Sequence, residues 1–166
     1  METIGLLVRW LHIIAAVIWI GGNLMMAMVV VPYFKRSVTP VERIQILSQI
    51  GRRFEPIVWG CVLVLFFSGL VNIFLSFPNL AGLADVFLRT LLIKLLFFVI
   101  LIVLTAIHSF VIGPRISQAV DALEAGTEEL PHHIEKMRHW MTVVSSLIGV
   151  FSLLILLAAV ALRMGI

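Results

Sequence analysis

The sequence predicts an all-α integral membrane protein, a four-helix bundle in up-down-up-down order with both termini outside. Two bulk properties support this fold class. Hydrophobic residues make up 61% of the 166-residue chain, and its mean hydropathy is +1.14. Charged residues make up 13%, about half the roughly 25% of an ordinary soluble domain. We therefore expect the lipid bilayer to be the principal surrounding of this chain.

Four apolar stretches are each long enough to cross a bilayer, which takes roughly 20 residues as a helix. They lie at about 5–32, 57–77, 89–113 and 140–162. Within lipid the backbone must satisfy its own hydrogen bonds, which favours helices. Because these spans occupy most of the chain, we expect residues 1–166 to form a single transmembrane domain.

The distribution of basic residues predicts the orientation of the bundle. Eight lie in the two long connections, 33–56 and 114–139, whereas three lie near the opposite ends of the spans: Arg9, Arg89 and Arg163. Basic residues favour the cytoplasmic side. We therefore expect a multi-pass protein of the bacterial inner (cytoplasmic) membrane, with the 78–88 loop outside. Because these bases set topology, they predict no nucleic-acid partner.

The first long connection contains a helix start, TPVE at 39–42. Thr39 can cap the helix, the proline suits its first position, and Glu42 completes a capping box. The sequence therefore predicts an amphipathic helix over 40–54 on the cytoplasmic surface. After the third span ends at a Gly-Pro pair, 115–127 is predicted to form a second surface helix.

Two ionisable residues lie deep within the predicted spans. His12 is seven residues into the first span, and Lys94 is five residues into the third. Both spans run inward, so at about 1.5 Å per residue the two lie at similar depth in the outer half. A lysine inside a membrane helix costs roughly 2.5–3.5 kcal/mol, less if it reaches the interface. We therefore expect Lys94 to face the bundle or to extend outward beside Arg89.

A second group of candidates lies in the inner half. His108 follows Lys94 by fourteen residues, which returns it to nearly the same helix face, about 21 Å deeper. Cys61 is near that depth and begins a polar stripe with Ser68 and Asn72. At the same depth the first span contributes Met25, Met26 and Met28, whereas His139 of the fourth span lies at the cytoplasmic edge, about 8 Å from His108 in depth.

The first hypothesis is a b-type haem protein for electron transfer or redox chemistry. Imidazole and thioether are common axial ligands of haem, and a four-helix bundle can hold the ring between facing helices. His12 would hold a haem near the outer face, and Arg9, Arg89 or Arg163 would pair with its propionates. Lys94 is a further cofactor-binding candidate, whose role the sequence leaves open.

A second haem would lie near the inner face, held by His108 together with Met26 or His139. Such a protein would exchange electrons with a quinone or a respiratory-chain protein. The sequence leaves open whether it is a membrane oxidoreductase and whether it forms a homo-oligomer.

The second hypothesis is a copper-handling or copper-transport protein. Sulfur ligands select Cu(I), and imidazole is tolerated beside them. Met26, Cys61 and His108 at one depth would form the inner metal site, and His12 would be the entry point outside. A third hypothesis is a small structural membrane subunit whose polar residues only fix helix packing.

Three long phrases resemble the copper-resistance protein D family of inner-membrane proteins. They are WLHIIAAVIWIGGNLMMAMVVVP, GRRFEPIVWGCVLVLFFSGLVNI and LLIKLLFFVILIVLTAIHSFVIGPR, in the first three spans. The resemblance covers about residues 8–117 and implies a link to copper uptake across the inner membrane. By motif it carries over to His12, Arg52, Arg53, Lys94, His108 and Arg115.

A weaker resemblance points to the haem-containing membrane protoporphyrinogen oxidases that use no flavin. They have a similar span-one histidine and span-three lysine, but also a further histidine where this chain has PYFKRS. We favour the haem hypothesis, because polar groups at two depths suit one cofactor per leaflet. An ion path between His12 and Met26 would need more polar groups than Asn23 and a glycine pair.

Overall fold

The computed structural model describes residues 2–76, 85–123 and 130–164. No strand occurs within these ranges, which are helical apart from short turns, so the predicted all-α class is confirmed. In chain order the elements are α1 (Glu2–Met25), η1 (Met26–Val30), α2 (Val31–Ser37), α3 (Pro40–Ser76), α4 (Asp85–Ala106), η3 (Ile107–Ile112), α5 (Gly113–Asp121) and α6 (His132–Met164).

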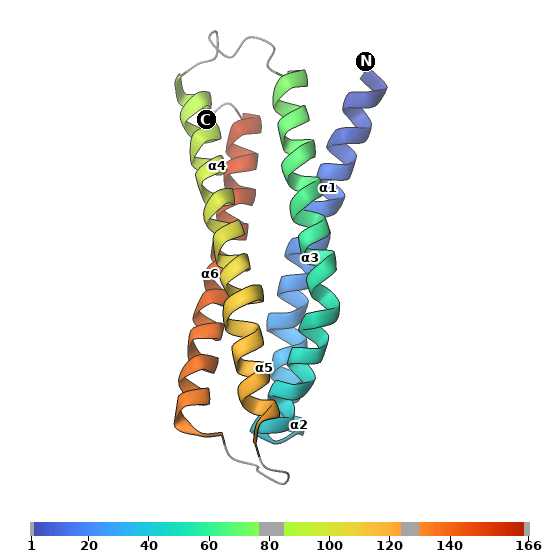
Figure 1. Cartoon of the computed structure of the whole chain (residues 1–166). Helices are drawn as coiled ribbons and strands as arrows, with labels where there is room; N and C mark the ends of the chain where they lie inside the picture. Colours follow the sequence, from blue (N-terminus) through green and yellow to red (C-terminus); the bar gives the residue numbers. More distant parts are fainter. Residues whose placement is uncertain (1, 77–84, 124–129, 165–166) are drawn as a thin grey trace.

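These elements form four rods that run alternately down and up (Figure 1). The first rod is α1, η1 and α2, the second is α3, the third is α4, η3 and α5, and the fourth is α6. Each rod is long and apolar enough to cross a membrane. The predicted up-down-up-down membrane bundle is therefore confirmed. Glu2 and Met164 lie at the same end (Figure 1), and the outward orientation of that end stays a prediction.

Two rods widen into a π-helix just before a proline. Proline has no N–H, and its ring crowds the carbonyl four residues earlier. The residue before each proline instead bonds five residues back: Val31 N–H donates to Met26 O, and Gly113 N–H donates to His108 O. Single π-turns occur frequently at functional sites. Here they include two of the candidate residues, Met26 and His108.

The prediction of a surface helix over 40–54 is wrong. That segment is the first part of α3, which runs for 37 residues without a break. At 1.5 Å per residue α3 is about 55 Å long, well beyond the roughly 30 Å hydrocarbon core. The predicted cap is confirmed, because Thr39 Oγ1 accepts a hydrogen bond from the N–H of Glu42 at 3.3 Å.

The lower ends of the rods have a core of their own, which explains this correction. α3, α5 and α6 bury an aliphatic cluster there. Burial of each of its side chains contributes roughly 1.5–3 kcal/mol to the stability of the fold. The cluster keeps α3 upright and aligns α5 with α4, so 115–121 continues the third rod. The rest of the predicted second surface helix includes 124–127, which lies outside the described residues. The cluster consists of Val41, Ile44, Ile116, Val120 and Ile134.

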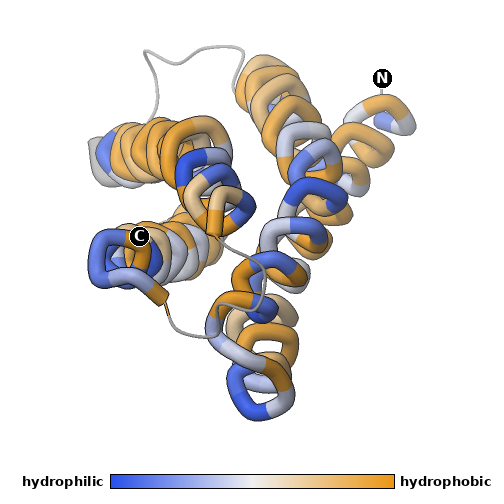
Figure 2. The backbone as a smooth tube through the Cα atoms, turned by 60° about the horizontal axis from the view of Figure 1, so that its bottom comes forward, coloured by the Kyte–Doolittle hydropathy of each residue, from blue (hydrophilic) through white to orange (hydrophobic). Residues whose placement is uncertain are grey.

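The four rods pack as two hairpins. α1 lies along α3, and α4 lies along α6; Figure 2 shows the two pairs nearly end-on. The pairs meet in a second buried cluster midway along the bundle. Most other apolar side chains are exposed, as expected where lipid covers the protein. The buried cluster consists of Ala15, Trp19, Cys61, Val62, Leu101, Val144 and Ile148.

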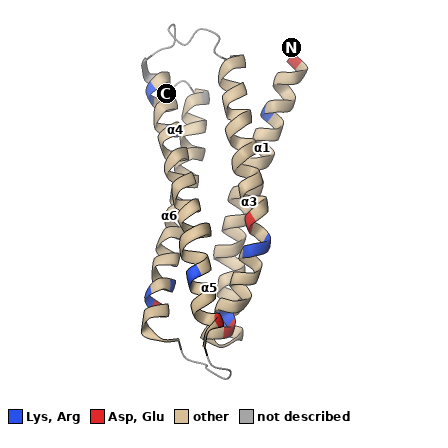
Figure 3. Cartoon of the chain, in the orientation of Figure 1, with Lys and Arg blue, Asp and Glu red and all other residues tan. Residues whose placement is uncertain are grey.

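Charged side chains avoid the middle of the rods. Figure 3 shows acidic and basic residues gathered over the lower ends, with a few near the upper ends. The long stretches between are almost free of charge. This distribution matches a bilayer that surrounds α3 from about Pro56 upward and leaves its first turns in water.

Candidate functional site

His12 lies half-buried between α1 and α3. Its Nδ1 is 2.8 Å from the hydroxyl oxygen of Ser68 on α3. The next residue of α3, Gly69, lies against the ring, and a Cβ added there would be 3.4 Å from His12 Cε1. α3 therefore offers the imidazole a hydroxyl partner and a surface without a side chain, and His12 faces the helix pair.

Ser68 fixes which nitrogen of His12 carries the hydrogen. The Ser68 hydroxyl donates to the backbone carbonyl of Val64, one turn earlier. A serine hydroxyl has a single hydrogen, so toward His12 it acts as the acceptor and His12 Nδ1–H is the donor. In the neutral ring Nε2 then has a free lone pair. Metal-binding histidines are commonly oriented in this way by a partner on the other ring nitrogen.

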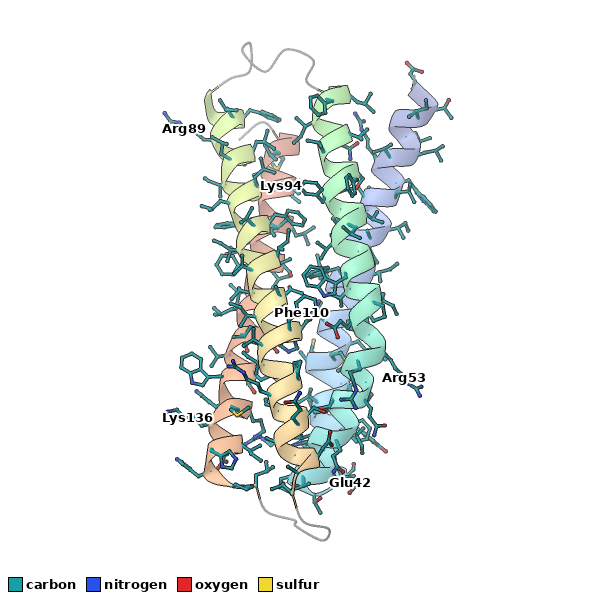
Figure 4. All side chains as sticks on the ribbon, in the orientation of Figure 1. Glu42, Arg53, Arg89, Lys94, Phe110 and Lys136 are labelled. Atoms are coloured by element: carbon teal, nitrogen blue, oxygen red, sulfur yellow. The ribbon has the colours of Figure 1, made fainter. Side chains whose placement is uncertain are left out.

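Lys94 and Asn72 are the other polar groups of this region. Lys94 is half-buried on α4 and lies between α4 and α3 in the upper part of the bundle (Figure 4). Its ammonium group is close enough to act electrostatically on His12. Asn72 lies one turn beyond Ser68, and its buried Oδ1 has no hydrogen-bond partner among the described residues. The structure thus brings His12 and Lys94 into one region, as their depths predict.

The packing of α1 on α3 sets the depth of Cys61. Gly22 of α1 lies opposite Phe54, where a Cβ would overlap the phenyl ring. Ten residues earlier, His12 lies opposite Ser68. Because the helices are antiparallel, Cys61 must lie beside the segment of α1 between His12 and Gly22.

Cys61 therefore does not lie at the depth of Met26, which corrects the sequence-based placement. Cys61 is buried in the cluster that contains Ala15 and Trp19. Met26 follows Trp19 by seven residues, about 10 Å further along α1. The predicted inner group of Met26, Cys61 and His108 thus divides into two levels.

His108 does share the level of Cys61. Trp59 of α3 stacks on Phe110 of η3 with ring centroids 5.3 Å apart, and Figure 4 labels Phe110 midway along the bundle. α3 and η3 are antiparallel. Cys61, two residues after Trp59, therefore lies at the same level as His108, two residues before Phe110. Cys61 and His108 therefore lie at one depth on neighbouring rods.

The remaining sequence candidates are less enclosed. Arg9 and His139 are exposed, and Met26 is half-buried. Within the described ranges, no three His, Cys, Asp or Glu side chains are close enough to hold a metal ion. The bundle therefore offers separate imidazole and thiol groups at two levels rather than a closed metal cage.

The sequence did not predict a polar network at the lower end. Arg52 Nη1 donates to Ser117 Oγ at 2.7 Å, and Ser117 Oγ lies 3.4 Å from Asp121 Oδ2. The resemblance pointed to Arg52, but nothing pointed to its partners on α5. A usable signal was the four-residue spacing of Ser117 and Asp121, which places both on one helix face.

Long apolar helices with polar groups between them define a multi-pass helical membrane protein. Within that class, a family model described as copper resistance protein D matches residues 48–162. The chain therefore belongs to the copper resistance protein D family, as its resemblance implied.

Two relatives show how far this similarity extends. An uncharacterized protein of Aquifex aeolicus (strain VF5) is 29% identical over 159 residues, 94% of this chain and 93% of the relative. The copper transport protein CutJ of Bacillus subtilis (strain 168) is 34% identical over 108 residues, 64% of this chain. That match spans 19% of CutJ, so CutJ is much the longer protein. No solved structure matches the chain.

These comparisons overturn the haem hypothesis. The descriptions of the family and of CutJ both name copper. The predictions of haem b, electron transfer and oxidoreductase chemistry are therefore wrong, whereas the predictions of a membrane protein and of copper stand. The inference failed because polar groups at two depths were assigned to two haems. In the structure the upper group is a histidine fixed by serine within one helix pair, and the lower group includes a buried thiol.

Proposed function

We propose that this protein handles copper as cargo in the bacterial inner membrane, accepting Cu(I) at His12 and passing it inward past Cys61 and His108. The observation that carries the proposal is membership of the copper resistance protein D family over residues 48–162. The similarity to a relative described as a copper transport protein supports the same direction.

His12 suits the first step because its ring is held in one orientation. Ser68 accepts the Nδ1 hydrogen, so Nε2 presents its lone pair without a competing proton. Imidazole is an acceptable ligand for Cu(I). Asn72 adds a buried carbonyl oxygen with no hydrogen-bond partner among the described residues, which can accept a hydrogen bond from a water that accompanies the ion.

Cys61 and His108 suit the second step. Thiolate sulfur selects Cu(I), and Cys61 is buried in the middle of the bundle. It precedes Ser68 by seven residues on α3, which is two turns and about 10 Å on nearly the same face. Two sparsely ligated levels at that spacing favour transfer, because a conducted ion must bind well enough to enter and weakly enough to leave.

Lys94 adds a repulsive charge to the upper level. A positive ammonium within electrostatic range of His12 opposes the binding of a cation. This repulsion shortens the residence of Cu(I) at His12. Lys94→Gln is therefore expected to tighten Cu(I) binding at His12 and to slow onward transfer.

The decisive experiment is Cu(I) binding to the protein in lipid nanodiscs, measured by competition with a chromophoric Cu(I) chelator. His12→Ala is expected to lower the affinity by at least about tenfold, the scale of losing a metal-site interaction. His139→Ala is the matched control, because His139 is exposed at the other end of the bundle. Equal affinity in the wild-type protein and in His12→Ala would contradict the proposal.

A second assay separates binding from movement. Proteoliposomes that contain a Cu(I)-responsive dye report entry of the ion. Cys61→Ser and His108→Ala are each expected to slow entry while leaving binding at His12 within about twofold, since the two levels are about 10 Å apart. Unchanged entry in both variants would rule out the inner step.

A further inference from the structure

A polar pocket opens between α3 and α5, away from the copper candidates. Its volume is about 240 Å³, and apart from two aliphatic side chains its walls are polar. The polar walls are formed by Gln45, Ser48, Gln49, Arg52, Ser117 and Asp121. The pocket thus combines one cation, one anion and several neutral hydrogen-bonding groups.

The two charges of the pocket are held close to each other without pairing. Arg52 and Asp121 both contact the hydroxyl of Ser117, at 2.7 and 3.4 Å, so the guanidinium Nη1 lies within about 6 Å of the carboxylate Oδ2. Arg138 and Glu135 form an ion pair, whereas no ion pair between Arg52 and Asp121 is found among the described residues. Ser117 therefore separates a positive and a negative group that both line the pocket.

The depth of the pocket matches the lipid headgroups. Arg52 lies one turn before Pro56, where the apolar part of α3 begins. Ser117 follows the apolar π-helix η3 by five residues. Arg52 and Ser117 therefore lie where hydrocarbon gives way to water, the level at which a bilayer carries its phosphates, and the rest of the pocket extends toward the water.

We propose that this pocket binds the headgroup of a zwitterionic phospholipid, with the phosphate on Arg52 and the ammonium on Asp121. Guanidinium matches phosphate geometry and can donate several hydrogen bonds. One Arg52 N–H is used by Ser117, which leaves others for the ligand, and Gln45 and Gln49 add amide donors. In phosphatidylethanolamine two carbons separate the phosphate oxygen from the ammonium, a spacing similar to that of the two protein charges.

The charge arrangement selects against simpler ligands. An anionic headgroup without an amine would bring negative charge to Asp121 with nothing to neutralise it. A free cation would meet Arg52. A dipolar headgroup satisfies both charges and fills the gap that Ser117 bridges.

Native mass spectrometry of the delipidated protein tests the proposal, with phosphatidylethanolamine and phosphatidylglycerol titrated in parallel. Arg52→Gln is expected to weaken phosphatidylethanolamine binding by about tenfold or more, because it removes the charged hydrogen-bond donor to the phosphate. Arg53→Gln is the matched control. Arg53 is the next residue, does not line the pocket and points away from the bundle in Figure 4.

Asp121→Asn provides a variant whose effect has a definite sign. It should reduce the preference for phosphatidylethanolamine over phosphatidylglycerol, and because Asp121 is exposed near a helix end, the fold should persist. Equal binding of both lipids by the wild-type protein, or equal loss in Arg52→Gln and Arg53→Gln, would overturn the proposal. So would displacement of the lipid by phosphoethanolamine or inorganic phosphate at equal concentration, since the ligand would then be a soluble phosphate.

Discussion

Two serines of this protein each accept a hydrogen bond from a basic side chain of another rod, but their own hydroxyl groups are directed at different acceptors. Ser68, at the level of lipid, accepts from His12 and donates to a backbone carbonyl of its own helix. Ser117, at the basic end, accepts from Arg52 and lies within reach of the Asp121 carboxylate. The hydrogen bonds of Ser68 involve one neutral imidazole ring, whereas the contacts of Ser117 link a positive guanidinium to a negative carboxylate.

The difference shows how membrane depth limits polar chemistry. In hydrocarbon an unpaired charge costs several kcal/mol. The His12–Ser68 pair closes its hydrogen bonds on the backbone and keeps a neutral nitrogen for a ligand, although Lys94 brings a charge to the same level. At the membrane boundary water and headgroups solvate charge, so Arg52 and Asp121 can remain apart. The same residue type therefore supports a soft-metal ligand at one depth and a charged pocket at another.

The largest expected effect is that of removing the upper serine. Ser68→Ala frees the His12 ring to rotate and to change tautomer, and loss of such a supporting partner typically costs 10–100-fold in metal affinity. Chelator competition in nanodiscs measures the loss of Cu(I) affinity, with the exposed Ser145→Ala as control. An affinity within twofold of the wild-type protein would show that Ser68 does not orient a ligand.

The next effect concerns the register of α1 on α3, on which the upper region depends. Gly22→Ala places a Cβ on the Phe54 ring and should destabilise the fold by about 1–3 kcal/mol. Gly21→Ala is an ideal control, because among the described residues nothing lies within 4 Å of an added Cβ there. Thermal unfolding in detergent should separate the two variants; identical midpoints would contradict the close approach.

A smaller change is expected when the lower serine is removed. Ser117→Ala removes one acceptor from Arg52 and one partner from Asp121, which should cost about 1 kcal/mol of stability. Cu(I) affinity should stay unchanged, because the network lies at the opposite end of the bundle from His12. A fall in Cu(I) affinity would mean that the two regions are coupled, which their separation argues against.

The smallest loss of stability is expected when the exposed ion pair between Arg138 and Glu135 is removed. Arg138 Nη2 lies 3.4 Å from Glu135 Oε1 on the surface of α6. Exposed helix pairs contribute roughly 0.2–0.5 kcal/mol. Glu135→Gln should therefore move the unfolding midpoint less than Gly22→Ala or Ser117→Ala does, and a larger shift than that of Ser117→Ala would show that solvent exposure does not set this ranking.

Sequence patterns predicted the long-range plan better than the site. Hydropathy predicted four spans, and Thr39 and Glu42 predicted the start of α3. The same amphipathic segment was assigned to the membrane surface, because its apolar face has no visible partner in sequence. That partner is the aliphatic face of α5 and α6, represented by Ile116 and Ile134.

Depth estimates failed for a related reason. Cys61 and Met26 were placed at one depth by counting residues from assumed span boundaries, and such a count does not show which residue of α1 lies beside which residue of α3. The contact of Gly22 with Phe54 sets the true register. No local pattern shows which residue of one helix will meet a glycine of another.

The sequence by itself determined that the chain crosses a membrane as four helices, where α3 starts, and to which family the chain belongs. Those properties depend on local composition, capping and motif, which each segment carries alone. The tertiary structure decided that His12 binds Ser68, that Cys61 shares a level with His108, and that Arg52 faces Asp121 across a pocket. Such pairs depend on helix register, which is fixed by side chains far apart in the chain that meet once the bundle has formed.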